Sequence, residues 1–230
     1  MKQLFFSLLA ITAITLGCKK ERIDNTQNAS DPEVVLKNNT SNPYEYIGQQ
    51  HNLSLGYMLS INSTDYNVAV SHVAQSLNEP QSRFAEWSTL ESGLNAAVAD
   101  GQGEFNNMTA DPNVGSYLTS LKSILLASNS STIEANTSNL VASILSPNNG
   151  LSDENRAVLL GTTAVAKHSF LFWSSYQGGI SLKTVWNDIV GFYQGFRLEW
   201  DNNLGLDGFA QKLEDSLLSG LGGAVYASSN

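Results

Sequence analysis

Apolar side chains that recur at helical spacing constrain the fold of this chain more than any other feature. From residue 42 onward a side chain of this kind returns every three or four positions, and the first stripe, in which His51 is the one polar member, is Tyr44, Ile47, His51, Leu55 and Met58. This spacing places them on one face of a helix, whereas a strand needs alternation of apolar and polar residues, which the sequence does not sustain. Residues 42–230 are therefore predicted to form an all-α domain, a compact bundle of seven to eight helices.

Short polar motifs mark the expected helix starts. Asn42 and Pro43 supply an N-cap acceptor followed by a first-turn proline, and Ser131–Glu134 has the pattern of a capping box. Ser152 is the expected cap of a long helix that continues to about Gln177. The expected helices start near residues 43, 65, 80, 112, 132, 152, 182 and 207.

The long helix is apolar almost all round between residues 157 and 173, apart from Lys167 and His168. A helix without a polar face is one that other helices surround. A charge and an imidazole within so short an apolar run argue against a membrane span. We therefore expect this helix to lie inside the bundle.

Composition excludes several classes of site. The chain carries 12 Lys+Arg against 21 Asp+Glu, a formal net charge of −9. Nucleic-acid binding needs clustered basic residues, so no nucleic-acid partner is expected. One Cys and three His leave little material for a disulfide framework or a metal centre, and neither a metal nor another cofactor is predicted.

The N-terminus has the order of a secretory signal. Lys2 supplies a positive charge, Leu4–Leu16 is a short apolar run, and the small Gly17 precedes Cys18, the only cysteine. This order is typical of a signal peptide, and the run is too short for a permanent membrane span. Residues 1–17 are therefore predicted to be a signal peptide.

Residues Thr15–Cys18, at the end of the predicted signal peptide and the residue after it, resemble the lipobox of bacterial lipoproteins. The resemblance implies acyl chains on Cys18, which would anchor the chain in a lipid bilayer of the cell envelope. By analogy with lipoprotein sorting, Lys19 favours the outer membrane. Polar residues 18–41 are predicted to be a lipidated tether. An ordinary cleaved signal with a free Cys18 is the alternative, and docking of Val34–Leu36 on the domain stays open.

His51 is the first candidate for a functional side chain. It lies on the apolar stripe of the first helix and could act as a ligand or general base beside Glu45 or a neighbouring helix. Glu45 and Asn52 are the other candidate residues on this helix. The structural alternative is a half-buried imidazole that hydrogen-bonds to the backbone, and it is favoured for His51 and His168 alike. Convergence of these two with His72 on a metal is not indicated by their spacing.

Nine aromatic residues fall between positions 168 and 200, and they are expected to be mainly core. Trp200 precedes Asp201 in a predicted loop and is the best candidate for an exposed aromatic side chain. Gly191 and Gly195 form a small-residue spacing that matches small residues in the last helix, including Gly222 and Gly223. This pattern predicts a tight hairpin of the last two helices.

Two of these motifs carry a family resemblance. Asn42–Glu45, followed by His51 and Asn52 after a lipoprotein signal, is similar to a group of uncharacterised lipoproteins from Bacteroidetes. A late Asp188 with Gly191 and Gly195 fits the same group. The resemblance covers the two ends of the domain, and it implies localisation and fold without assigning an activity.

Two main functions are compatible with the sequence, and a structural or immunity-type partner of a secreted protein is a third possibility. The first is a non-catalytic binding or interaction module on a lipid tether, with an unidentified protein or glycan partner. The alternative is an envelope hydrolase with a carboxylate and His51 at its centre. A cleft that gathers His51 with two carboxylates of raised pKa would favour the hydrolase.

Overall fold

The computed structural model describes residues 41–99, 101–176, 181–202 and 208–230. Cys18, the predicted tether and Val34–Leu36 lie outside the described residues, so those predictions stay as stated. Within the described ranges the chain forms nine α-helices, one 3₁₀ helix and no strand, which confirms the all-α prediction. The helices are α1 (Glu45–Ser60), α2 (Tyr66–Leu77), η2 (Gln81–Arg83), α3 (Trp87–Ala99), α4 (Gly101–Asn106), α5 (Pro112–Ala127), α6 (Ile133–Leu145), α7 (Asp153–Ser175), α8 (Leu182–Asn202) and α9 (Phe209–Ser229).

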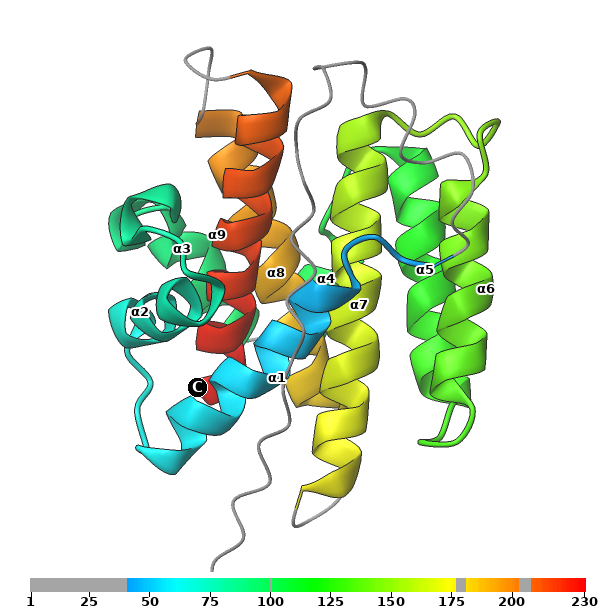
Figure 1. Cartoon of the computed structure of the whole chain (residues 1–230). Coiled ribbons are helices and arrows are strands. Elements are labelled where there is room, and N and C mark those ends of the chain that lie inside the picture. The colour runs from blue at the N-terminus through cyan, green and yellow to red at the C-terminus, as the bar shows by residue number, and fades with distance from the viewer. Residues whose placement is uncertain (1–40, 100, 177–180, 203–207) are drawn as a thin grey trace, which may run out of the picture. The chain divides into compact units, whose positions relative to one another are not determined.

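The antiparallel pair α8 and α9 lies at the centre of the domain (Figure 1). Helix α7 packs against α8, and α1 crosses in front of both α7 and α9. Helices α2 and α3 cover one side of α9, while α5 and α6 cover the far side of α7. Helix α1 therefore joins the two sides, and its inner face contacts the most buried helices.

The middle of α7 is buried as the sequence predicts. Every residue from Ala157 to Ala166 is buried, because α1, α6 and α8 contact different faces of this segment. No helix in the described part of the chain is long and apolar enough to cross a membrane.

Glycines set the close approach of α8 and α9. A Cβ atom on Gly191 would lie 2.6 Å from the carbonyl oxygen of Gly223, and one on Gly195 would lie 2.5 Å from that of Ser219. Both contacts are with backbone, which cannot rotate away. Gly222 instead faces the side chain of Val70 on α2, at 3.1 Å from such a Cβ. Helices α8 and α9 are therefore so close at Gly191 and Gly195 that only glycine, which has no Cβ atom, fits at these positions.

Two predicted helix starts and one predicted cap differ from the structure. The third helix begins at Trp87, because Pro80 precedes only the single turn of η2, and the extended Phe84 fills the core from outside any helix. The capping box at Ser131–Glu134 does not form, since the Thr132 hydroxyl accepts from the backbone N–H of Asn129 instead of from its own helix.

The first helix begins at Glu45, two residues later than its motif suggests. The Asn42 side chain still accepts a hydrogen bond at the helix start, from the backbone N–H of Tyr44 (3.0 Å). Its amide also donates to the carbonyl oxygen of Leu160 (2.8 Å), which fastens the start of α1 to α7. Ser152 caps α7 as predicted, by accepting from the backbone N–H of Asn155.

Candidate functional site

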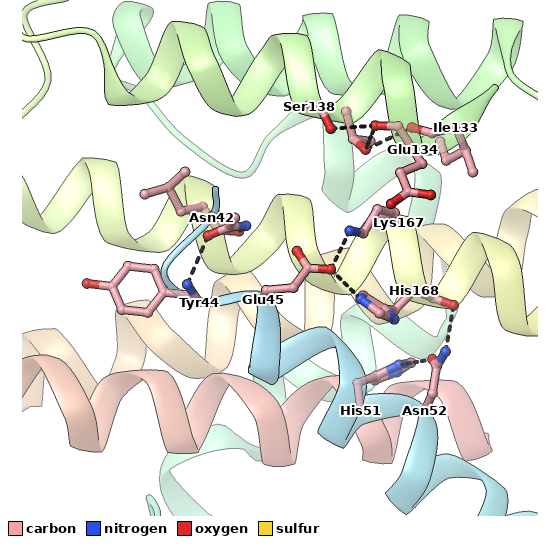
Figure 2. Close-up of polar contacts among 12 residues, drawn as sticks. Asn42, Tyr44, Glu45, His51, Asn52, Ile133, Glu134, Ser138, Lys167 and His168 are labelled. Carbon is pink, nitrogen blue, oxygen red and sulfur yellow. Dashed lines mark hydrogen bonds and ion pairs between the residues drawn. The ribbon is translucent and has the colours of Figure 1, made fainter. Parts of the chain in front are cut away.

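Glu45 forms an ion-pair cluster with α7 (Figure 2). Its Oε1 atom accepts from the ammonium group of Lys167 and from Nε2 of His168, the latter at 2.6 Å. Burial by itself would raise the pKa of Glu45, but the hydrogen bonds from His168 and Lys167 outweigh it and hold that pKa below its ordinary value. An ionised, doubly paired carboxylate is poorly suited to act as a general acid.

Asn52 fixes the tautomer of His51. The Asn52 amide nitrogen donates to the carbonyl oxygen of His168 (2.8 Å), so its oxygen must face the imidazole (Figure 2). That oxygen lies 3.1 Å from Nδ1 of His51, which therefore carries the proton and donates. In the neutral ring, Nε2 is consequently left as an acceptor.

Asp188 of α8 lies opposite this acceptor. Its Oδ2 atom is 3.6 Å from Nε2 of His51, beyond an ordinary hydrogen bond. The same oxygen accepts a hydrogen bond from the hydroxyl of Ser169 and a longer one, 3.4 Å, from the indole of Trp173. Three helices, α1, α7 and α8, therefore meet at one carboxyl group.

Burial shifts the pKa values of this pair in opposite directions. It lowers the pKa of His51 to about 4, although the hydrogen bond to Asn52 favours the charged form. It raises the pKa of Asp188 to about 7, although the Ser169 hydroxyl favours the carboxylate. A proton on the Asp188 carboxyl avoids placing a carboxylate opposite the lone pair of Nε2. At 3.6 Å the two groups make no direct hydrogen bond, and Nε2 has no hydrogen-bond partner among the described residues.

The His51–Asp188 pair is sealed inside the domain. Both residues are 0% exposed, and Ser169 is also 0% exposed. A general base must come within hydrogen-bond reach of the proton that it abstracts, which a substrate cannot provide here without separating helices. Glu45 does not join the pair, since its partners are Lys167 and His168.

Sequence reasoning placed His51 and Asn52 next to each other but missed their partners. Asp188 was noted only as part of a glycine pattern, and His168 only as a structural residue. Asp188 is a charged residue within the apolar stretch Val185–Phe196 of α8, and this contrast is the signal that could have identified it.

Trp200 does not lie in a loop, because α8 continues through Asn202. Its ring stacks on Phe196 with centroids 6.0 Å apart, and the ring of Phe209 makes a T-shaped contact with centroids 5.7 Å apart. The ammonium group of Lys212 lies 4.5 Å from the ring centroid. The side chain is half-buried and occupied by these neighbours, so the prediction of an exposed loop tryptophan is wrong.

A shallow depression lies between α1, α2 and η2, apart from the buried pair. Its volume is about 330 Å³. Tyr57 forms its aromatic wall and stacks on His72, with ring centroids 4.1 Å apart and planes 14° apart. The lining residues are Tyr57, Asn67, Val68, Ser71, His72, Gln75 and Gln81.

Among the residues that the structure describes, no three His, Cys, Asp or Glu side chains are grouped to hold a metal ion. Comparison with protein-family models, with curated proteins and with solved structures finds no match to this chain. The chemistry of the described residues is therefore the basis for the proposals below.

Proposed function

We propose that this chain is an envelope lipoprotein, held by acyl chains on Cys18, whose helical domain is a non-catalytic binding module. The order of basic residue, apolar run, Gly17 and Cys18 supports the anchor. Two or more acyl chains make a practically stable anchor, whereas a domain of net negative charge gains nothing from an anionic membrane surface. Lys19 supports the outer membrane as the location.

The burial of His51 and Asp188 is the observation that carries the non-catalytic assignment. These two groups place an imidazole beside a carboxyl of raised pKa, and each has 0% exposure. Their contacts join α1 to α7 and α8, which is a packing role. The open depression beside Tyr57 holds groups suited to binding, since amides and hydroxyls donate and accept without ionising.

The second candidate function is an envelope hydrolase. One observation favours it: a carboxyl with a pKa of about 7 beside a neutral imidazole is tuned for proton transfer near neutral pH. That function requires an open form of the domain in which α1 leaves α8. We rank it second because nothing in the described contacts of α1 provides a path from solvent to Asp188.

Labelling with a fatty-acid probe tests the anchor. Wild-type chain should incorporate the probe and sediment with membranes, and Cys18→Ser should do neither. Ser7→Ala, inside the apolar run, is the matched control and should be acylated normally. Acylation of Cys18→Ser, or wild-type chain without acyl groups, would contradict the anchor.

Hydrolysis assays separate the two candidate functions. We expect full chain in detergent to show no turnover of nitrophenyl esters, nitrophenyl glycosides or a labelled peptide library beyond that of a blank preparation. Turnover that Asp188→Asn abolishes, while Asp153→Asn on the surface of α7 leaves it intact, would establish the hydrolase instead.

A further inference from the structure

The depression beside Tyr57 is built without a charged side chain. All seven lining residues are uncharged, although 14% of the chain is Asp, Glu, Lys or Arg. An ionic ligand would find no counter-charge among them, and burying an unpaired ion is costly. The lining therefore selects for a neutral ligand.

The aromatic wall consists of Tyr57 and the stacked His72. The Tyr57 residue is 39% exposed, and His72 stacks on one face of its ring, so a ligand can reach only the part of the side chain that His72 leaves uncovered. Burial lowers the pKa of His72, which therefore stacks as a neutral imidazole near neutral pH. A ligand with one apolar face can pack on this surface, because flat contact with an aromatic ring buries area at little entropic cost.

Helix α2 presents hydrogen-bonding groups along the same depression. Asn67, Ser71 and Gln75 are spaced four residues apart, so they form a row with a rise of about 6 Å between neighbours. Among the described residues the side-chain amides of Asn67 and Gln75 have no hydrogen-bond partner. The Ser71 hydroxyl accepts from Gln81 at 3.0 Å, which ties η2 to the row.

We propose that this depression binds an uncharged carbohydrate. A pyranose has an apolar face for Tyr57 and a rim of hydroxyls that both donate and accept, as the amides of Asn67 and Gln75 do. A row of about 12 Å along α2 suits an oligosaccharide better than a single ring. The inference rests on the proposed function, because it names the ligand class of the binding module.

Calorimetric titration tests the proposal with full chain in a detergent that lacks a sugar headgroup. The probes are linear oligosaccharides of glucose, mannose and xylose, with oligogalacturonate as the charged comparison. At least one neutral probe should bind, and Tyr57→Ala should weaken it about tenfold or more. Tyr46→Ala is the matched control, since Tyr46 lies on the same helix with the same 39% exposure but outside the depression.

Two further variants keep the test decisive. Tyr57→Phe preserves the flat ring and should bind within about threefold of wild type. Gln75→Ala removes an exposed amide, should leave the unfolding midpoint unchanged and should weaken binding. If Tyr57→Ala does not fold, Gln75→Ala decides.

The proposal is overturned if no neutral oligosaccharide binds, if only oligogalacturonate binds, or if the Tyr57 and Gln75 variants bind as wild type does. Failure of the sugar inference is distinguishable from failure of the binding module. A non-sugar probe, such as a neutral peptide, that binds with the same dependence on Tyr57 would overturn the sugar and preserve the module. Hydrolysis of any bound oligosaccharide would overturn the module itself.

Discussion

Replacement of Gly195 by alanine should destabilise the domain because α8 and α9 touch through their backbones there. The new Cβ atom would lie 2.5 Å from the carbonyl oxygen of Ser219, whereas ordinary contacts start at 3.4 Å. The two helices must therefore separate by roughly the difference, 3.4 − 2.5 = 0.9 Å, which loosens the packing around Phe192 and Phe196. Overpacking of this kind costs about 1–3 kcal/mol, although alanine returns about 1 kcal/mol of helix propensity.

Gly56→Ala is the matched control for this prediction. Gly56 lies inside α1, and a Cβ atom there would meet nothing within 4 Å. Helix propensity alone should then stabilise the domain by about 0.5–1 kcal/mol. Urea denaturation followed by tryptophan fluorescence should place Gly195→Ala up to about 2 kcal/mol below wild type and Gly56→Ala above it. A Gly195→Ala domain as stable as the Gly56→Ala domain would refute the close crossing.

Two further predictions concern the buried pair and the helix caps. The raised pKa of Asp188 confers stability that is present below about pH 4 and is lost as pH rises through about 7. The lowered pKa of His51 confers stability that is present above about pH 6.5 and is lost as pH falls through about 4. These two effects oppose each other between pH 4 and 6.5. In urea denaturation over that range, the stability of Asp188→Asn relative to wild type should therefore increase as pH rises. The stability of His51→Gln relative to wild type should decrease as pH rises. Equal pH profiles for the two variants would show that neither group titrates with folding. Asp111, which accepts from the backbone N–H groups of Asn113 and Val114, caps α5, so Asp111→Ala should lower the free energy of unfolding by about 1 kcal/mol. Ser131→Ala should cost less than half of that in the same assay, and an equal loss would contradict the cap assignment.

The fold could be predicted because the apolar stripes carry most of its information. The stripe of the first helix placed Ile47, Leu55 and Met58 on one face, and all three are fully buried. The third helix was misplaced because Pro80 opens only one turn, after which Phe84 reaches the core in extended conformation. The spacing of apolar residues indicates that a residue is buried, but it does not indicate whether that residue belongs to a helix or to a loop.

Of the buried pair, only His51 could be identified from the sequence. Neighbours in sequence, such as His51 and Asn52, are visible as a motif. The contact of His51 with Asp188 joins α1 to α8, and no spacing in a single sequence encodes which helices meet. Trp200 was placed in a loop because polar residues follow it, but contacts with Phe196 and Lys212 hold it within the last turns of α8.

The central claim is that His51 and Asp188 are sealed groups that hold helices together. Nitrogen NMR of the histidine side chains tests it most directly, since it reports protonation and tautomer for each ring. For His51 we predict a neutral ring with its proton on Nδ1 from pH 5 to 8, and slow exchange of that proton with solvent. A His51 ring that titrates near pH 6.5 and exchanges its proton rapidly would show an accessible imidazole, and would contradict the account.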